Sequence, residues 1–548
     1  MDPILWRRRM FPVCVVIFFF IGICCSDKAP DYTFVHDSKS APTELFYDYI
    51  IIGGGTAGCP LAATLSQGAS VLLLERGGSP YGDRNIENIA NFGAPFTDSS
   101  PGSPSQSFVS EDGVLNARAK VLGGGSALNA GFYTRAPPDY VRNAGWDARL
   151  VEDSYQWVER KVAFRPPMKQ WQSAVRDGLL EVGVSPYNGF TYDHMYGTKV
   201  GGTIFDENGH RHTAANLLEY AQPGRTNVLL HATVHKIVFS TGGKRPKANG
   251  VLFEDSEGKL HTAYLTKHPA SEIILSAGAI GSPQILMLSG IGPKYHLSAH
   301  GIKVLVDQPM VGQGMADNPM NALVVPSRKP VEVSLIQVVG ITRFDSYIEA
   351  ASGVTFGFRP RTSMLPPLLA GLINTTSFNA GIIVEKIMGP VSTGSLELRT
   401  TDPRDNPSVT FNYFKEPEDL RRCVQGMQTI IDIVNSEALS SFRYEQLPVE
   451  ALIELVLNSP VNLRPRHLSA AFSLEQFCID TVMTIWHYHG GCQVGKVVDH
   501  DYRVLGVDNL RVVDGSTFNY SPGTNPQATV MMLGRYVGQK ILQQRKSS

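Results

Sequence analysis

Residues 47–75 read YDYIIIGGGTAGCPLAATLSQGASVLLLE, and this stretch decides the fold. An apolar run at 47–52 passes through a glycine-rich turn into a segment of helical composition, and a second apolar run at 70–74 ends on Glu75. A strand, a G-x-G-x-x-G turn, a helix, a second strand and a terminal acid within one βαβ unit are typical of dinucleotide-binding domains.

Each glycine of the turn has its own physical role. Gly53 permits the tight turn, Gly55 lets a pyrophosphate approach the backbone, and Gly58 lets the helix pack closely on the strand. The helix N-terminus offers unpaired N–H groups and a partial positive charge to phosphates. Glu75 is placed to accept hydrogen bonds from a ribose. The unit therefore predicts a dinucleotide site without saying which dinucleotide it holds.

Length and composition limit the classes of protein to consider. The chain has 548 residues, too many for one core, so we expect two or three packed domains. Its net charge is −1, and without an excess of Lys and Arg to neutralise phosphates we expect no nucleic-acid partner. A hydrophobic share of 43% and a charged share of 18% are typical of a folded enzyme.

The N-terminus has the pattern of a secretory signal. Three arginines at 7–9 precede an apolar run at 11–25, which is shorter than the roughly 20 residues that span a bilayer. We interpret residues 1–26 as a cleaved signal peptide and expect a secreted protein with no stable membrane span. An uncleaved anchor is the alternative, because no small-x-small cleavage site stands out at 22–26.

Cysteine usage agrees with an oxidising compartment. Three of the seven cysteines lie in the predicted signal. Cys59, at the start of the fingerprint helix, is expected to be a packed thiol, and Cys423 and Cys478 are the expected disulfide. The chain also carries glycosylation sequons at Asn374 and Asn519, the second weakened by a following proline.

Periodicity predicts an α/β organisation with a discontinuous first domain. Helical patterns occupy 151–161 and 171–182, and strand signals occupy 227–239, 250–253 and 272–276. We expect the fingerprint strand and these strands to share one sheet. The first, Rossmann-like domain would span 45–310, with insertions around 140–200, and return at 481–548. A second domain at 311–480 would be built on an antiparallel sheet with helices.

Three further segments carry chemistry. Residues 118–131, RAKVLGGGSALNAG, contain a glycine run whose backbone can lie flat against a large planar ligand. Residues 276–292 predict a strand, a small-residue turn and a helix that begins at Ser282-Pro283 and stops at Gly290. Residues 484–492, TIWHYHGGC, place His487 and His489 in a glycine-rich corner, where we expect one of them to be catalytic.

Together these segments resemble the glucose–methanol–choline oxidoreductases, and within them the plant branch that holds HOTHEAD-like oxidoreductases and (R)-mandelonitrile (hydroxynitrile) lyases. The resemblance covers nearly everything after residue 44, with both family signatures at 118–131 and 278–292. It implies FAD as the cofactor, an FAD-binding first domain and a substrate-binding second domain. The residues implied at the cofactor are Gly53, Gly55, Thr56, Ala57, Gly58, Glu75, Arg76, Val121, Ser126, Asn129, Ala130, Gly131, Phe132, Val234, Trp486, Asp514, Gly515, Pro526 and Gln527.

The resemblance also implies a catalytic pair. The family's histidine in H-x-x-G-x-C falls on His487, and its second position, a histidine or an asparagine, falls on Asn525. Tyr488 and His489 would then shape the substrate pocket. Asparagine stands at this second position in the HOTHEAD-like sequences, within the same S-P-G-T-N-P-Q context, whereas the mandelonitrile lyases carry histidine there.

Physical chemistry links that difference to the reaction. A neutral histidine, with an ordinary pKa of about 6.5, can take a hydroxyl proton while hydride moves to flavin N5. Asn525 can hold the developing alkoxide by donating a hydrogen bond. Cyanohydrin cleavage instead requires a cationic environment for cyanide. An asparagine supplies no titratable cation, although His489 could substitute.

The leading hypothesis is a secreted, FAD-dependent oxidoreductase that oxidises a primary or secondary alcohol, with a long-chain hydroxy lipid as the candidate suggested by the HOTHEAD resemblance. The first alternative is an (R)-hydroxynitrile lyase in which FAD is structural. The second is a non-catalytic flavin-binding protein. No metal is expected.

Overall fold

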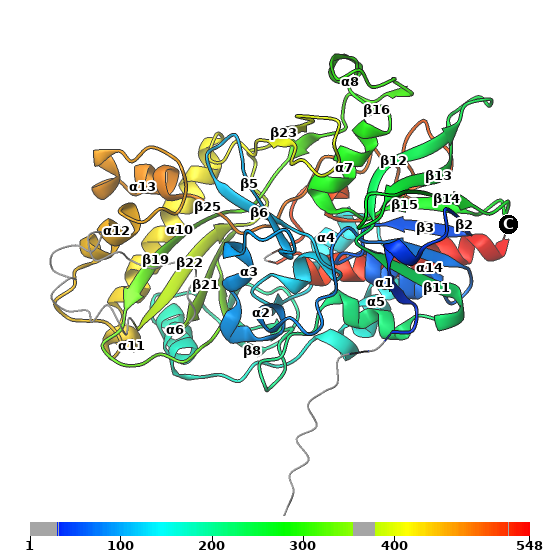
Figure 1. The fold of residues 1–548 in the computed structure, drawn as a ribbon. Coiled ribbons are helices and arrows are strands. Elements are labelled where there is room, and N and C mark those ends of the chain that lie inside the picture. The colour runs from blue at the N-terminus through cyan, green and yellow to red at the C-terminus, as the bar shows by residue number, and fades with distance from the viewer. Residues whose placement is uncertain (1–29, 31, 354–378, 524, 548) are drawn as a thin grey trace, which may run out of the picture.

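The computed structural model describes residues 30, 32–353, 379–523 and 525–547, which form two lobes joined along one side (Figure 1). One lobe holds a parallel sheet with the fingerprint strand, the first helix and the last helix. The other holds an antiparallel sheet covered by the yellow and orange helices. The predicted signal at 1–26 and the sequon at Asn374 lie outside the described residues.

The first lobe is organised around a six-stranded sheet in which every neighbouring pair is parallel. Such a sheet must be covered on both faces, which explains why its central strands, at 49–52 and 71–74, are continuous apolar runs. In spatial order its strands are β1 (Val35–Asp37), β11 (Thr226–Leu230), β4 (Val71–Leu74), β3 (Tyr49–Ile52), β15 (Glu272–Leu275) and β26 (Leu510–Val512).

The two faces of this sheet bury alternate residues in two separate cores. Ile50 and Ile52 pack with α7 (Gly278–Leu288) and a second sheet, whereas Tyr49 and Ile51 pack against helices. This division follows from the two-residue period of a strand. The helices on that face are α1 (Gly58–Leu65), α5 (Ala148–Val162) and α14 (Gln527–Ser547).

The strands at 233–254 belong to a different sheet from the fingerprint strand, so the expectation of one shared sheet is wrong for them. The run at 227–239 breaks at His231, whose φ of 58° turns the chain out of the parallel sheet. The second sheet is antiparallel apart from its last pair, and its order is β12 (Thr233–Ser240), β13 (Lys247–Glu254), β14 (Leu260–Leu265) and β2 (Glu44–Tyr47).

The second lobe contains a seven-stranded sheet that is antiparallel except at one edge pair. Its order is β25 (Met483–Thr484), β19 (Pro319–Pro326), β22 (Ala380–Ile387), β21 (Ser346–Ser352), β20 (Val338–Ile341), β9 (Gly197–Val200) and β8 (Tyr187–Phe190). The helices of this lobe are α6 (Gln170–Glu181), α10 (Pro417–Asn435), α11 (Glu437–Ser440), α12 (Val449–Leu457) and α13 (Leu474–Thr481). The predicted fold class, a Rossmann-like domain with a second domain on an antiparallel sheet, is confirmed.

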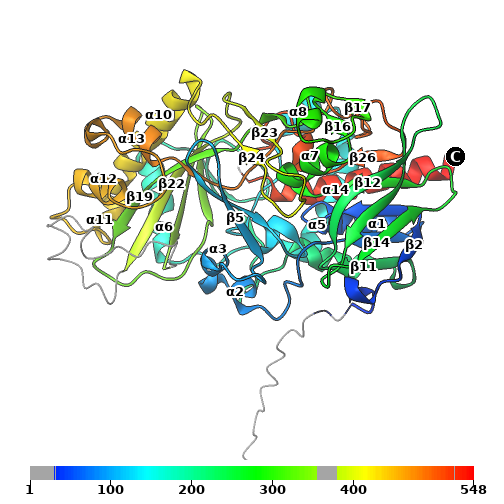
Figure 2. The ribbon, with the colours of Figure 1, turned by 45° about the horizontal axis from the view of Figure 1, so that its top comes forward.

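The chain passes between the lobes several times. Of the segment at 140–200, α5 packs on α14 in the first lobe, while α6, β8 and β9 join the second. A hairpin of β5 (Ser105–Val109) and β6 (Leu115–Ala119) runs between the lobes, as Figure 2 shows in blue. The site described below is therefore assembled from elements that are distant in the sequence.

The remaining elements are short. They are η1 (Ser38–Ser40), α2 (Arg84–Glu87), η2 (Ile89–Asn91), α3 (Ala94–Thr97), η3 (Gly124–Ala127), β7 (Phe132–Tyr133), α4 (Pro138–Asn143), β10 (Gly202–Thr203), η4 (Ala214–Tyr220), η5 (Pro223–Arg225), β16 (Ile291–Gly292), α8 (Lys294–Ala299), β17 (Val306–Asp307), β18 (Gln313–Met315), β23 (Gly394–Glu397), β24 (Ser408–Val409), η7 (Leu468–Ala471) and η8 (Gly515–Thr517).

The predicted disulfide is confirmed, since Cys423 on α10 is bonded to Cys478 on α13. Cys59 is a buried free thiol, as expected, and Cys492 is another. The sequon asparagine Asn519 is exposed. Within the described ranges, no helix has the length and apolarity needed to cross a membrane.

Candidate active site

A cavity of about 680 Å³ lies between the two lobes and is lined by both. Of the residues predicted at the cofactor, the catalytic pair and the pocket, all line this cavity except two, Gly58 and His489. Segments separated by more than 400 residues in the sequence therefore meet around one space. Across the described part of the chain, no three His, Cys, Asp or Glu side chains are grouped so that they could hold a metal ion.

The fingerprint turn forms one wall of the cavity. Gly53, with φ of 102°, follows β3 and donates from its N–H to Leu74 O at 2.8 Å. A Cβ at Gly58 would lie 2.0 Å from Gly53 O, so Gly58 allows the helix to touch the strand. The N–H groups of Gly55 and Thr56 donate no hydrogen bond within the described ranges. They are therefore available to an anion in the cavity.

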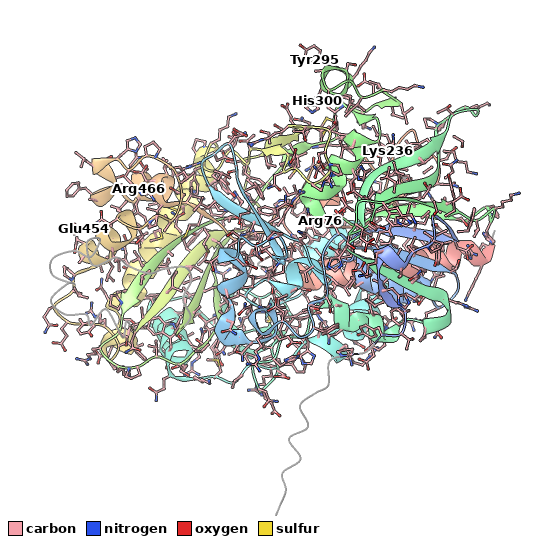
Figure 3. All side chains as sticks on the ribbon, viewed as in Figure 1. Arg76, Lys236, Tyr295, His300, Glu454 and Arg466 are labelled. Atoms are coloured by element: carbon pink, nitrogen blue, oxygen red, sulfur yellow. A yellow bond between two sulfur atoms is a disulfide. The ribbon has the colours of Figure 1, made fainter. Side chains whose placement is uncertain are left out.

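Glu75 and Arg76 follow the second strand and also line the cavity. The Glu75 carboxylate accepts from Gly54 N at 2.9 Å and from Gly77 N at 2.8 Å, which fixes it at the end of β4, and burial raises its pKa. Arg76 donates to Gln106 Oε1 at 2.6 Å. Figure 3 labels Arg76 near the middle of the molecule, where the lobes meet.

The glycine run at 123–125 packs directly on the fingerprint turn. Gly123 N donates to Gly54 O at 2.7 Å, and a Cβ at Gly124 would lie 2.7 Å from Gly55 Cα. Ser126 holds this loop by donating to Gly123 O at 2.7 Å. The glycine-rich turns at 53–58 and 123–125 are thus brought together into one continuous surface, here called the glycine surface.

The start of α14 is tied to this surface through side-chain amides. Asn129 Nδ2 donates to Gln527 Oε1 at 2.8 Å, and Gln527 Nε2 donates to Phe132 O at 2.6 Å. Arg211 also binds the loop, donating to Asn129 O at 2.6 Å. The C-terminal segment therefore keeps a fixed position relative to the 118–131 signature.

The 276–292 segment follows β15 and forms a turn and a helix, but the helix begins earlier than expected. Helix α7 starts at Gly278, and Pro283 lies inside it. Asp514 explains this start, because its Oδ2 accepts from Gly278 N at 2.9 Å and from Ser282 Oγ at 2.5 Å. Ser282 thus binds Asp514 instead of capping the helix, and burial raises the pKa of Asp514.

The glycine surface leaves room for a bound dinucleotide. A Cβ at Gly55 would meet no protein atom closer than 3.8 Å, at Gly125 none closer than 4.0 Å, and at Gly278 none within 4 Å. All three residues line the cavity, so side chains there would occupy it. The open backbone, the free N–H groups and the acid at Glu75 together fit a dinucleotide with its diphosphate on the turn.

The opposite wall of the cavity is apolar. It combines the cavity-facing residues of the antiparallel sheet with an aromatic cluster in which Trp486 stacks on Phe96 at 4.7 Å between ring centroids. Tyr488 donates from its hydroxyl to Asn116 Oδ1 at 2.9 Å and stacks on Phe411. The apolar lining residues are Phe92, Phe96, Met320, Ile336, Ala351, Ile382, Val384, Met483 and Ile485.

His487 is held by two residues that precede β19. Its backbone N–H donates to Asp317 Oδ1 at 2.8 Å, and its ring Nδ1 lies 3.2 Å from Asn318 Nδ2. Asn318 also donates to Ser521 Oγ at 3.2 Å. The other ring nitrogen, Nε2, makes no hydrogen bond within the described ranges, while the residue lines the cavity.

Both histidines of the corner are kept neutral by their surroundings. Burial, together with the charge of Lys386, lowers the pKa of His487 well below its ordinary value. Burial lowers the pKa of His489 to about 4. His489 is 3% exposed and hydrogen-bonded through Nδ1 to His487 O at 3.0 Å. His489 therefore holds the backbone of His487 by this hydrogen bond and supplies no cation at neutral pH.

Asn525 lines the cavity at the start of the last helix, and its Oδ1 accepts from Lys386 Nζ at 3.0 Å. Lys386 pairs with Glu349, and neither was expected at the site. Asp317 and Asn318 were also missed. One signal was available, because residues 380–387 read AGIIVEKI and place two adjacent charged residues, Glu385 and Lys386, near the end of an otherwise apolar strand.

Two protein-family models match the chain, and both are described as GMC oxidoreductase. The N-terminal model matches residues 47–320, and the C-terminal model matches residues 390–534. These two matches include both signatures, the fingerprint turn, His487 and Asn525.

Among curated proteins, the chain is 53% identical to Protein HOTHEAD of Arabidopsis thaliana, covering 91% of this chain and 88% of that protein. It is 50% identical to an (R)-mandelonitrile lyase-like protein of the same plant, covering 93% and 92%. It is 44% identical to Sinalpyl alcohol oxidase Nec3 of Nesocodon mauritianus, covering 94% and 90%. Among solved structures, a formate oxidase shares the fold, with a TM-score of 0.76 and 19% identity over 92% of this chain and 100% of that one.

Proposed function

This chain belongs to the GMC oxidoreductase family, and we propose that it is a secreted, FAD-dependent enzyme that oxidises a primary or secondary alcohol. The observation that carries the proposal is the meeting of three features in one cavity: the glycine surface, His487 with a free Nε2, and Asn525. The predicted signal peptide supports secretion, and the disulfide is consistent with an oxidising compartment.

The residues that would hold FAD are those of the glycine surface. The backbone at Gly55 and Thr56 would bind the diphosphate, Glu75 the ribose, and Val234 the adenine side. Bound FAD would supply a hydride acceptor at flavin N5. The 118–131 loop and the start of α14, linked through Asn129 and Gln527, would keep that acceptor in position.

The chain's own chemistry is proton transfer and charge stabilisation. His487 Nε2 takes the proton of the substrate hydroxyl, as a neutral imidazole does when its pKa is lowered by burial. Asn525 donates a hydrogen bond to the oxygen as its negative charge develops. The start of α14 at Gln527, two residues after Asn525, adds the positive end of a helix dipole to the same place.

The apolar wall favours a substrate whose hydroxyl group is attached to a large apolar group. Aliphatic side chains on the sheet and the Trp486–Phe96 stack offer no ionic partner, so a charged group placed against this wall would be desolvated without compensation. Long-chain hydroxy lipids and phenylpropanoid-type alcohols both meet this requirement. One relative of the chain, Sinalpyl alcohol oxidase Nec3, is named for an alcohol of the second class.

The lyase is the alternative, supported by the likeness to an (R)-mandelonitrile lyase-like protein. Cyanide release needs a cation at the site, and His489 is kept neutral by burial, with a pKa of about 4. Lys386 lies beside Asn525 but is paired with Glu349. This arrangement favours alcohol oxidation, and the presence of both His487 and Asn525 in the cavity argues against a non-catalytic flavoprotein.

The decisive experiment is anaerobic mixing of the purified flavoprotein with each substrate class. Sinapyl alcohol and a long-chain primary alcohol should bleach the visible flavin absorption and yield the aldehyde. Mandelonitrile should leave the absorption unchanged and release no cyanide above the background rate. Cyanide release with no bleaching by any alcohol would replace the proposed function with the lyase. Inactivity toward both classes would favour the non-catalytic flavoprotein.

A further inference from the structure

A buried ion pair lies on the face of the seven-stranded sheet that lines the cavity. Lys386 on β22 and Glu349 on β21 are both fully buried, with Lys386 Nζ 2.9 Å from the carboxylate. Because side chains alternate between the faces of a strand, Lys386 shares its face with Ile382 and Val384, which both line the cavity. The activity proposed above gives this pair no role.

The Lys386 ammonium also contacts the loop that carries Asn525. Its Nζ lies 3.0 Å from Asn525 Oδ1, which joins the antiparallel sheet to the start of α14. An ammonium group has three N–H donors and no acceptor, so only the oxygen of the amide can occupy this place. The amide of Asn525 therefore has one orientation, whereas an asparagine without such a partner could have either.

With its oxygen bound to Lys386, Asn525 has its NH₂ group on the other branch of the amide. Asn525 lines the cavity, and its Nδ2 donates no hydrogen bond to any residue that the structure describes. An N–H donor fixed in advance at a cavity wall is what stabilises negative charge that develops on a substrate oxygen. The contact with a cation also polarises the amide and strengthens this donor.

A purely stabilising role explains the pair less well. Burying two charges carries a desolvation penalty, and an apolar pair of similar volume is often equally stable. An apolar side chain in place of Lys386 would pack against Met320 and Tyr347, which lie opposite Lys386 in register on the two adjacent strands. A charge retained among these neighbours and directed at Asn525 indicates a functional role.

We propose that Lys386 is the positioning residue that holds Asn525 with its NH₂ group toward the substrate oxygen, and that Glu349 keeps Lys386 charged and in place. The proposal deepens the proposed function and rests on it for the identity of the ligand as an alcohol. Lys386 does not line the cavity, so it acts through Asn525 and touches no substrate.

Lys386 also influences the titration of His487. Its positive charge lowers the pKa of His487, in the same direction as burial and the neighbouring His489. Other ionisable groups packed on this corner include Asp317, whose pKa burial raises to about 6, and Tyr413, which donates to Asp317 at 2.6 Å. Tyr488 lies there too, and burial raises its pKa. Removal of the Lys386 charge should therefore raise the pKa of His487.

The test uses a probe that binds but cannot react. A tertiary trifluoromethyl benzylic alcohol has an acidic hydroxyl and no carbinol hydrogen, and its binding to the flavoprotein is followed through the flavin absorption. The variant Lys386→Met/Glu349→Leu removes the pair without leaving a carboxylate buried alone. We expect its Kd for the probe to rise by about tenfold to hundredfold, as the loss of a charge-assisted hydrogen bond implies.

A double-mutant cycle separates positioning from a general structural effect. In the Asn525→Ala background, removal of the pair should cause no further rise in Kd, because Lys386 acts through Asn525. The matched control is Lys199→Met. Lys199 is another fully buried lysine of the same sheet, bound to Thr134 Oγ1 at 2.8 Å, and its loss should leave Kd unchanged. Equal losses in both Asn525 backgrounds, or an unchanged Kd without the pair, would overturn the proposal.

Turnover on the same proteins distinguishes the two proposals. Coupling of Lys386 to Asn525 in probe binding, with no alcohol oxidised by the wild type, would contradict the proposed function alone. Oxidation of an alcohol without any coupling would contradict the positioning role alone. The acidic limb of kcat/KM should also move to higher pH in Lys386→Met/Glu349→Leu, an effect that a merely structural lysine would not have.

Discussion

At the level of single residues, the proposed reaction depends on the protonation state of His487. Its pKa is lowered well below the ordinary value by burial and by Lys386, so the neutral base persists into mildly acidic solution. We expect kcat/KM for an alcohol to remain level down to below pH about 6.5, and His487→Ala to lower kcat by about 10²–10⁴-fold. Initial rates measured across pH check both. An acidic limb above that pH, or wild-type turnover in His487→Ala, would contradict the role.

Asn318 sets which ring nitrogen of His487 can act. A free lone pair at Nε2 requires the ring proton on Nδ1, and Asn318 is the side chain 3.2 Å from that nitrogen. In the structure Asn318 Nδ2 faces this nitrogen and also donates to Ser521 Oγ at 3.2 Å, while Oδ1 is buried without a hydrogen-bond partner among the described residues. The base needs the opposite orientation of the amide, in which Oδ1 accepts from Nδ1–H and the bond from Nδ2 to Ser521 is lost. The unpaired oxygen is therefore available to fix the tautomer that the base needs.

Substitution of Asn318 should consequently change the pH profile. Asn318→Asp places a negative charge beside the ring and should move the acidic limb of kcat/KM upward by about one pH unit. Asn318→Leu should lower kcat by more than it raises KM, because it removes the hydrogen-bond partner of the ring. Steady-state rates across pH measure both effects. The tautomer role would be refuted by an Asn318→Asp profile identical to that of the wild type.

At the scale of the element, the two glycines of the fingerprint turn should differ in what they tolerate. Gly55 has open space in front of it, whereas a Cβ at Gly58 would meet Gly53 O at 2.0 Å. Gly55→Ala should therefore fold with normal circular dichroism but retain less flavin, and Gly58→Ala should lose folded protein. Flavin content and thermal unfolding measure these outcomes. Full flavin retention in Gly55→Ala would remove the turn from the cofactor site.

Element boundaries could be predicted from the sequence where local chemistry decides them. The fingerprint unit follows its glycines and apolar runs closely, with strands at Tyr49–Ile52 and Val71–Leu74. The run at 227–239 could not be divided, because its break depends on one residue, His231, taking a φ of 58°. The start of α7 depends on Asp514, a residue more than 230 positions away. The periodicity of the sequence does not indicate such long-range partners.

At the scale of the whole molecule, the site joins two lobes, and the same distances limit prediction from the sequence. His487 and Asn525 stand in motifs and were expected at the site. Lys386 contacts Asn525 from 139 positions away, through the register of β22, which no local pattern predicts. Glu349 likewise meets Lys386 only because β21 and β22 pair. Residues within motifs were therefore predictable, and the residues that support them from another lobe were not.

The disulfide should stabilise the second lobe alone. It joins α10 to α13 across 55 residues, so its loss should lower the free energy of unfolding by about 2–4 kcal/mol. We expect Cys423→Ala/Cys478→Ala to show a lower Tm with normal flavin content, because the glycine turns lie in the other lobe. Reduction of the wild type provides the control. A Tm equal to that of the oxidised wild type would contradict this prediction.

The proposed reaction breaks an alcohol C–H bond in the cavity between the lobes. Its most direct test is anaerobic stopped-flow mixing of the flavoprotein with a primary alcohol and with the same alcohol deuterated at the carbinol carbon. We expect the alcohol to bleach the flavin absorption. Deuterium at the carbinol carbon should slow the bleaching, and Asn525→Ala should slow it further. A flavin that stays oxidised with every alcohol, while mandelonitrile is cleaved to aldehyde and cyanide, would contradict it.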